Sequence, residues 1–99
     1  MEHSISHEDD GRRGAFFILQ DGRRISEMSY VRSGASVVID HTLVAPELRG
    51  RNVARSLLDA AVDWARRTDT KLSATCSYVQ VQFARDSGLR DVIGHDVAG

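Results

Sequence analysis

The sequence contains a single cysteine, Cys76, so it cannot close a disulfide within the chain. It also lacks the paired cysteines and histidines of a structural zinc site, and we expect no metal. A free thiol is typical of a reducing compartment, so the sequence predicts a cytoplasmic protein without covalent or metal crosslinks. With 99 residues the chain has the length of one domain, and we expect a single domain over residues 1–99.

Long apolar runs and an excess of one charge are also missing. The longest uninterrupted apolar run is Ala15–Leu19, whereas a transmembrane helix needs about 20 apolar residues. Residues 1–10 are polar and acidic, unlike a signal peptide. The 13 basic residues are balanced by 14 acidic ones, whereas a nucleic-acid binder needs a basic surface that displaces counterions. We therefore expect neither a membrane nor a nucleic acid as a partner.

Turn-forming pairs divide the first 44 residues into short segments rich in β-branched and aromatic residues. Asp-Gly and Ser-Gly pairs at positions 10–11, 21–22 and 33–34 mark the turns. This spacing predicts an antiparallel meander of about four strands, which we place near His3–Glu8, Gly14–Gln20, Arg23–Arg32 and Ala35–Val44.

The fourth of these strands carries apolar residues on both faces. Strict alternation predicts one face with Val37, Ile39, His41 and Leu43, and another with Val38, Asp40, Thr42 and Val44. Because both faces are partly apolar, we expect a central strand that is covered on both sides. The lone proline, Pro46, then ends its pairing.

Helical periodicity begins after this strand. Val53, Leu57, Ala61 and Trp64 recur at helical spacing and predict a long helix that ends near Arg67. Charged residues on the opposite side of this helix are typical of a solvated face, and they are Arg55, Asp59, Asp63 and Arg67.

The rest of the chain completes a crossover. Lys71–Cys76 is predicted to be a fifth strand, parallel to the fourth through a right-handed connection. Tyr78–Arg85 is predicted to be a short second helix, and Leu89–Ile93 a last edge strand. The expected fold is therefore α+β with a mixed sheet: an antiparallel meander, one β-α-β crossover and a short C-terminal helix.

The strongest local signal lies in the loop from the fourth strand into the long helix, Val44–Ala54. The first amides of a helix have no intrahelical acceptor, and they lie at the positive end of the helix dipole. Gly50 allows close approach of the backbone, and Arg49 and Arg51 carry guanidinium groups that match phosphate. The loop predicts an anion site, although the same residues also fit an ordinary loop with solvated arginines.

This loop resembles the pyrophosphate loop of the Gcn5-related N-acetyltransferases, which reads Gln/Arg-x-x-Gly-x-Gly/Ala. Arg49 and Ala54 occupy its first and last positions, and Asn52 stands where the family has glycine. From His41 to Arg85 the chain looks like the small, single-domain branch of the family, in which the helices between the first two strands are missing. The resemblance implies a minimal fold of this kind.

The resemblance also implies a co-substrate, acetyl-CoA, bound in a V-shaped opening between the fourth and fifth strands. Its pyrophosphate would lie on the backbone of residues 51–54, and its pantetheine arm would pair with the backbone near residues 43–44. The implied cofactor-binding residues are Leu43, Val44, Arg49, Gly50, Arg51, Asn52, Val53 and Ala54. The acceptor would be an amine, either a protein lysine or a small molecule.

Three residues are candidates for the proton transfers. The family often has a tyrosine acid on the second helix, but Phe83 aligns with it here. Cys76 could act as acid, base or transient acyl acceptor, and it could equally be a small buried hydrophobe. Tyr78 is a possible substitute acid or a packing residue. His41 is a possible base, or a hydrogen-bonded core residue on the face of Ile39.

The sequence therefore predicts an acetyl-CoA-dependent N-acetyltransferase. Asn52 and Phe83, which both depart from the family pattern, keep open a CoA-binding module without efficient catalysis. A third possibility is an interaction or redox-sensing domain without a cofactor, in which Cys76 is the reactive group.

Overall fold

The computed structural model describes residues 4–94. Strands come first: β1 (Ser6–Asp9), β2 (Arg13–Gln20), β3 (Arg23–Ser33) and β4 (Ser36–Val44). A short 3₁₀ helix η1 (Pro46–Leu48) leads to the long helix α1 (Val53–Thr68), which is followed by β5 (Lys71–Ala74), α2 (Ser77–Arg85) and a second 3₁₀ helix, η2 (Ser87–Val92). The expected α+β fold is confirmed, since these elements form an antiparallel meander followed by one crossover.

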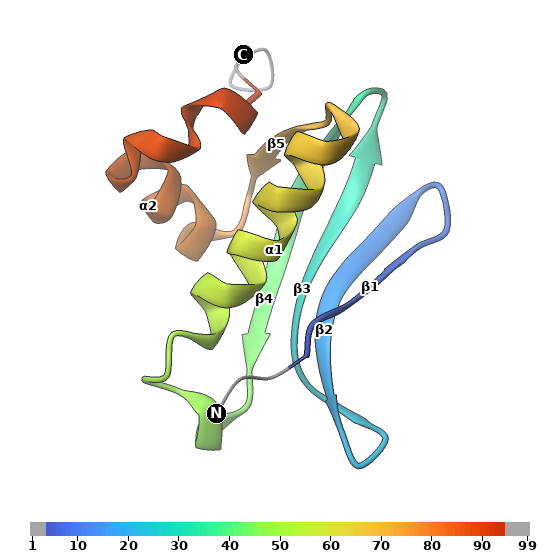
Figure 1. The fold of residues 1–99 in the computed structure, drawn as a ribbon, viewed down its shortest axis with the longest axis vertical. Helices are drawn as coiled ribbons and strands as arrows, with labels where there is room; N and C mark the ends of the chain where they lie inside the picture. Colours follow the sequence, from blue (N-terminus) through green and yellow to red (C-terminus); the bar gives the residue numbers. More distant parts are fainter. Residues whose placement is uncertain (1–3, 95–99) are drawn as a thin grey trace.

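The five strands form one sheet in the order β1-β2-β3-β4-β5 (Figure 1). The first four are antiparallel neighbours, and β5 pairs with β4 in parallel. α1 packs against β2, β3, β4 and β5, and α2 contacts β5 and η2 at the edge of the sheet. No helix among residues 4–94 is long and apolar enough to cross a membrane.

The core lies between α1 and one face of the sheet. The apolar stripe of α1 is buried as its spacing predicts, and Leu57 and Leu58 are fully buried. From the sheet, Met28, Val37 and Ile39 pack against this stripe. Burial of such side chains is the main stabilising contribution in a domain of this size.

A β-bulge in β4 overturns the predicted faces of that strand. Tyr30 of β3 pairs with Ile39, but Ser29 pairs with His41, so Asp40 is an extra residue. A bulge of one residue exchanges the two faces for all later positions. Beyond it, His41 and Leu43 are exposed on the face opposite α1. The prediction that β4 is covered on both sides was wrong for this half of the strand.

The last predicted strand was also wrong, because Leu89–Ile93 is largely the 3₁₀ helix η2. The Asp86 side chain accepts a hydrogen bond from the Gly88 amide at 2.9 Å, which starts this helix. A spacing of three residues then buries both Leu89 and Val92 on one side. Ile93 keeps a single bridge to Leu72 of β5. His3, in the first predicted strand, lies outside the described residues.

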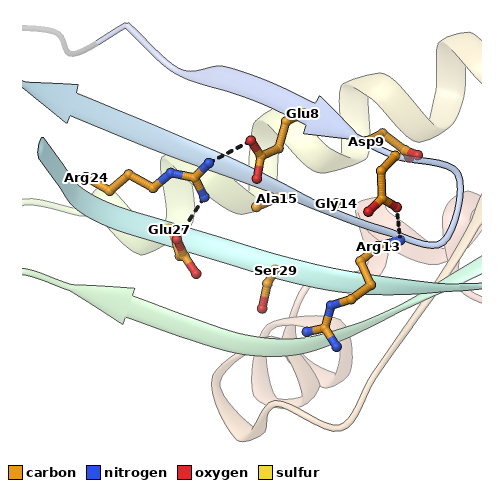
Figure 2. A pocket seen from close by; sticks show the side chains of 9 residues that line it. Glu8, Asp9, Arg13, Gly14, Ala15, Arg24, Glu27 and Ser29 are labelled. Carbon is orange, nitrogen blue, oxygen red and sulfur yellow. Dashed lines mark hydrogen bonds and ion pairs between the residues drawn. The ribbon is translucent and has the colours of Figure 1, made fainter. Parts of the chain in front are cut away.

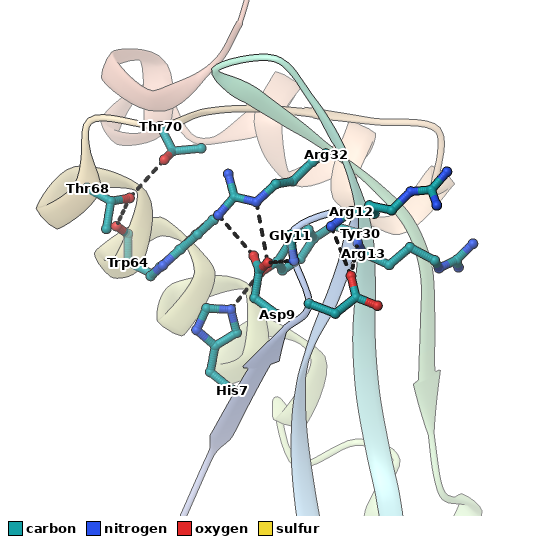
Figure 3. Close-up of polar contacts among 11 residues, drawn as sticks. His7, Asp9, Gly11, Arg12, Arg13, Tyr30, Arg32, Trp64, Thr68 and Thr70 are labelled. Atoms are coloured by element: carbon teal, nitrogen blue, oxygen red, sulfur yellow. Dashed lines mark hydrogen bonds and ion pairs between the residues drawn. The ribbon is translucent and has the colours of Figure 1, made fainter.

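A polar cluster ties β1 to β3 at the edge of the core (Figure 3). Tyr30 is almost fully buried, and its hydroxyl donates to Asp9 at 2.6 Å and lies 2.6 Å from His7 Nε2. Arg32 forms an ion pair with Asp9 at 3.0 Å. Burial alone would raise the pKa of Asp9, but the hydrogen bonds from Tyr30, the Gly11 amide and Arg32 hold it at about 2.

Candidate functional site

A pocket of about 290 Å³ lies where β4, the loop after it, α1 and α2 meet. Its lining residues are Val44, Leu48, Arg49, Gly50, Asn52, Val53, Ala54, Arg55 and Tyr78. Six of the eight residues predicted to bind a cofactor are among them, the exceptions being Leu43 and Arg51. One catalytic candidate, Tyr78, lines the same pocket.

The backbone at the start of α1 is shaped for an anion. Gly50 and Asn52 have positive φ angles of 84° and 59°, and these turn the chain sharply into the helix. The backbone amide of Arg51 donates to the Leu48 carbonyl. The first hydrogen bond of α1 runs from the Ser56 amide to the Asn52 carbonyl. Within the described residues, the amides of positions 52–55 have no acceptor. They are free donors at the positive end of α1.

The strands β4 and β5 diverge beside this pocket. Their pairing ends at Ile39 and Ala74, whereas β4 continues to Val44. The Ala45 amide donates to Ile25 of β3 at 2.8 Å. Because backbone groups alternate in direction along a strand, those of Val44 point away from β3 and into the opening that β5 leaves.

The same alternation corrects the prediction for Leu43. Its backbone faces Glu27 of β3, and its side chain is exposed on the far face. The bulge at Asp40 is the reason, because it shifts the phase of every later residue in β4. Val44 and Thr42, instead of Leu43, therefore present their backbone groups to the opening.

Arg55 is a site residue that the sequence interpretation missed, since it was assigned to a solvated face. Its guanidinium donates to Asp59 on its own helix, to Gln82 at 2.9 Å and to Asp86 at 2.5 Å. It is about two-thirds buried and ties α1 to α2 while lining the pocket. Its partners Gln82 in α2 and Asp86 directly after α2 lie far away in the sequence, so helical periodicity alone could not identify them.

We expect Arg55→Ala to lower the free energy of unfolding by about 1 kcal/mol, because Asp86 and Gln82 lose their shared donor. Arg67→Ala is the matched control, since its ion pair with Asp63 on the same helix is largely exposed. Such a pair contributes little. Urea denaturation of the two variants measures the difference, and equal losses would show that Arg55 does not hold α2 in place.

Tyr78 and Phe83 occupy different positions on α2. Phe83 is half-buried and packs against the core. Its side chain has no polar group that could donate a proton. Tyr78 lies in the first turn of α2 and lines the pocket. Burial raises the pKa of the Tyr78 phenol, although the nearby Arg55 partly opposes this effect. The phenol is therefore protonated at neutral pH and can serve as an acid.

The other two catalytic candidates are placed differently. Cys76 is half-buried at the N-terminus of α2, and its sulfur lies 3.2 Å from the Thr42 hydroxyl. His41 is exposed on the far face of the sheet, so its interpretation as a core residue was wrong. Among residues 4–94, His41 has no side-chain hydrogen bond to Cys76 or Tyr78.

A second hollow, of about 440 Å³, lies on the face of the sheet opposite α1 (Figure 2). Its floor consists of small residues, including Ala15 and Ser29. At one side Arg24 is ion-paired with Glu8 at 2.7 Å and with Glu27 at 3.1 Å. Because Arg24 is already paired with two carboxylates, this side of the hollow keeps a net negative charge. The α1 pocket instead has free amide donors, so we place the candidate site at α1.

The resemblance of the loop implies CoA as its ligand, and on this basis we expect Asn52→Gly to increase the affinity for CoA severalfold. Asn52 adopts a left-handed conformation, and its side chain makes no capping hydrogen bond to α1. Glycine adopts this conformation at less cost and removes a side chain from the pocket. Asn52→Ala is the control, because it removes the amide and keeps the strained backbone. Calorimetry on the three proteins decides, and weaker binding by Asn52→Gly would show that the asparagine contacts the ligand.

Comparisons with known proteins point to one family. The model of the GCN5-related N-acetyltransferases matches residues 15–92. Protein NATD1 of Xenopus tropicalis is 35% identical over 89 residues, which cover 87% of this chain and 80% of that protein. Protein NATD1 of Homo sapiens is 36% identical over 89 residues, which cover 86% and 76%.

A solved structure agrees with the expected minimal fold. The NMR structure of a GCN5-like protein from Staphylococcus aureus is 27% identical and matches with a TM-score of 0.70. The match covers 90% of this chain and 87% of the other. The two chains therefore share most of their architecture.

Proposed function

Because the chain belongs to the GCN5-related N-acetyltransferase family, we propose that it transfers the acetyl group of acetyl-CoA to the nitrogen of an amine. The observation that carries this proposal is the pocket at the start of α1. Free amides and the helix dipole at this point favour a pyrophosphate. Arg49 lines the same pocket, and its guanidinium group can pair with a phosphate, so the residues present fit the ligand.

We propose that the opening between β4 and β5 takes the arm that carries the thioester. The backbone groups of Val44 and Thr42 are directed into this opening, where they can pair with the amides of the arm. A donor held there polarises the thioester carbonyl as negative charge develops on its oxygen. The residues around the opening thus bind and orient the acetyl donor.

In the transfer, the amine nitrogen forms a bond to the acetyl carbon, and the bond from that carbon to sulfur breaks. The amine must lose a proton, and the departing thiolate must gain one. Tyr78 lines the pocket and carries a proton at neutral pH, so it is one candidate donor of the second proton. Burial raises the pKa of its phenol, which makes it a weaker acid than a free tyrosine. Cys76 is the alternative donor at the narrow end of the opening, and water can accept the proton of the amine.

The proposal is tested by incubating the protein with acetyl-CoA and an amine and measuring the release of free CoA. A lysine-containing peptide and a set of small primary amines serve as acceptors, and the same peptide with acetylated amines is the control. Release that depends on a free amine supports the transfer. Binding of acetyl-CoA without transfer to any amine would instead support a CoA-binding module.

We expect Cys76→Ala to lower turnover by at least about tenfold, with similar CoA affinity, if the thiol takes part in the transfer. Cys76→Ser separates the possible roles, because a hydroxyl still donates a hydrogen bond but is a much poorer nucleophile. Steady-state kinetics on the three proteins measure the effect. Full activity of Cys76→Ala would leave Cys76 as a packing residue and assign the proton transfer to Tyr78 or water.

A further inference from the structure

The contact between Thr42 and Cys76 bridges the two sides of the opening between β4 and β5. The Thr42 hydroxyl lies 3.2 Å from the Cys76 sulfur, and both side chains are half-buried. Thr42 is on β4 beyond the last residue paired with β5, and Cys76 follows the end of β5. The two side chains therefore meet just past the point where the strands separate.

Two stretches of chain lead from the α1 pocket to this contact and converge on it. Thr42 precedes Val44 by two residues, which is about 7 Å along a strand, and Cys76 precedes Tyr78 by two residues on the opposite side. Val44 and Tyr78 both line the open pocket, whereas Thr42 and Cys76 touch. The opening is therefore wide at the pocket and narrow at the contact.

Beyond the contact the opening is closed by the backbone. The Ile39 carbonyl accepts hydrogen bonds from the amides of Thr75 and Cys76, at 3.0 and 3.2 Å. Ile39 itself pairs with Ala74 in the parallel ladder. A ligand arm that enters from the pocket and runs along β4 therefore ends at Thr42 and Cys76.

We propose that Thr42, with Cys76, limits the transferred acyl group to two carbons. This inference rests on the proposed function, because it takes the end of the opening as the place of the acyl group. An acetyl group ends at the two side chains, and each further methylene of a longer acyl group must displace them. Exclusion of one methylene from a closed pocket is worth about 10- to 200-fold in specificity.

The test compares acetyl-, propionyl- and butyryl-CoA as donors to one amine for the parent, Thr42→Ala and Thr42→Val. We expect the parent to prefer acetyl-CoA over propionyl-CoA by about tenfold or more in kcat/KM. Thr42→Ala opens the end of the channel and should remove most of this preference. Thr42→Val should retain it, because valine has the shape of threonine and carries a methyl group in place of the hydroxyl.

The preference is a ratio, so partial loss of folded protein in a variant does not change it. An unchanged preference in Thr42→Ala, or equal use of acetyl- and propionyl-CoA by the parent, would overturn the inference while acetyl transfer itself stands. Calorimetry with the same three donors gives a second readout. If the parent binds none of them, the proposed function fails together with the inference.

Discussion

Ala54→Glu is expected to weaken CoA binding by at least about 100-fold, or about 2.7 kcal/mol. Ala54 lines the pocket in the first turn of α1. A carboxylate at this position would stand among the free amides and repel the phosphates that they are proposed to bind. It would also satisfy those amides itself and so compete with the ligand.

Ser56→Glu is the matched control for this substitution. Ser56 belongs to the same turn of α1, is exposed and does not line the pocket. The Ser56→Glu substitution adds the same charge at a greater distance from the proposed phosphate position, where solvent screens this charge. Calorimetric affinities should differ by about tenfold or more between the two variants. Equal losses would mean that the effect is a general change in charge and that Ala54 is not at the contact.

Gly14→Ala is expected to lower the free energy of unfolding by about 3 kcal/mol. A methyl group on Gly14 would lie 2.3 Å from the Cζ and Oη atoms of Tyr30 and 2.7 Å from the Glu8 carbonyl oxygen. The ring of Tyr30 cannot yield easily, because it is almost fully buried and its hydroxyl is fixed by Asp9 and His7. Urea denaturation measures the loss.

Gly88→Ala is the control for the loss of glycine itself. Its added methyl group would meet only the Asp86 side chain, at 3.1 Å, and the end of that side chain can move. We expect a change below about 1 kcal/mol, since alanine also restricts the unfolded chain. A loss as large as that of Gly14→Ala would show that steric overlap with Tyr30 is not the cause.

The order of the strands and α-helices from β1 to α2 could be predicted because these elements have local signals in the sequence. Asp21 and Gly22 form the turn between β2 and β3 with positive φ angles, as that pair favours. The apolar spacing of α1 marks both its position and its buried face. The loop Arg49–Ala54 carries a motif with a specific backbone role, so most of the candidate binding residues could be named in advance.

The predictions fail where one extra residue shifts the alternation of side chains along a strand. They also fail where the contact partner of a residue is distant in the sequence. The bulge at Asp40 has no signature in the alternation of β4, yet it decides that Thr42 and not His41 lies beside Cys76. The role of Arg55 depends on Gln82 in α2 and on Asp86 directly after that helix. Leu89 and Val92 fit both a strand and a 3₁₀ turn, and the cap by Asp86 selects the turn.

The central claim is that acetyl-CoA binds with its pyrophosphate at the start of α1 and its arm along β4. A titration of the ¹⁵N-labelled protein with acetyl-CoA, followed by NMR at every amide, tests this claim most directly. The largest shifts should fall on Val44 and on the amides of positions 49–55, whose donors at positions 52–55 are free. Shifts confined to β1 and β2, or no shifts at millimolar acetyl-CoA, would contradict it.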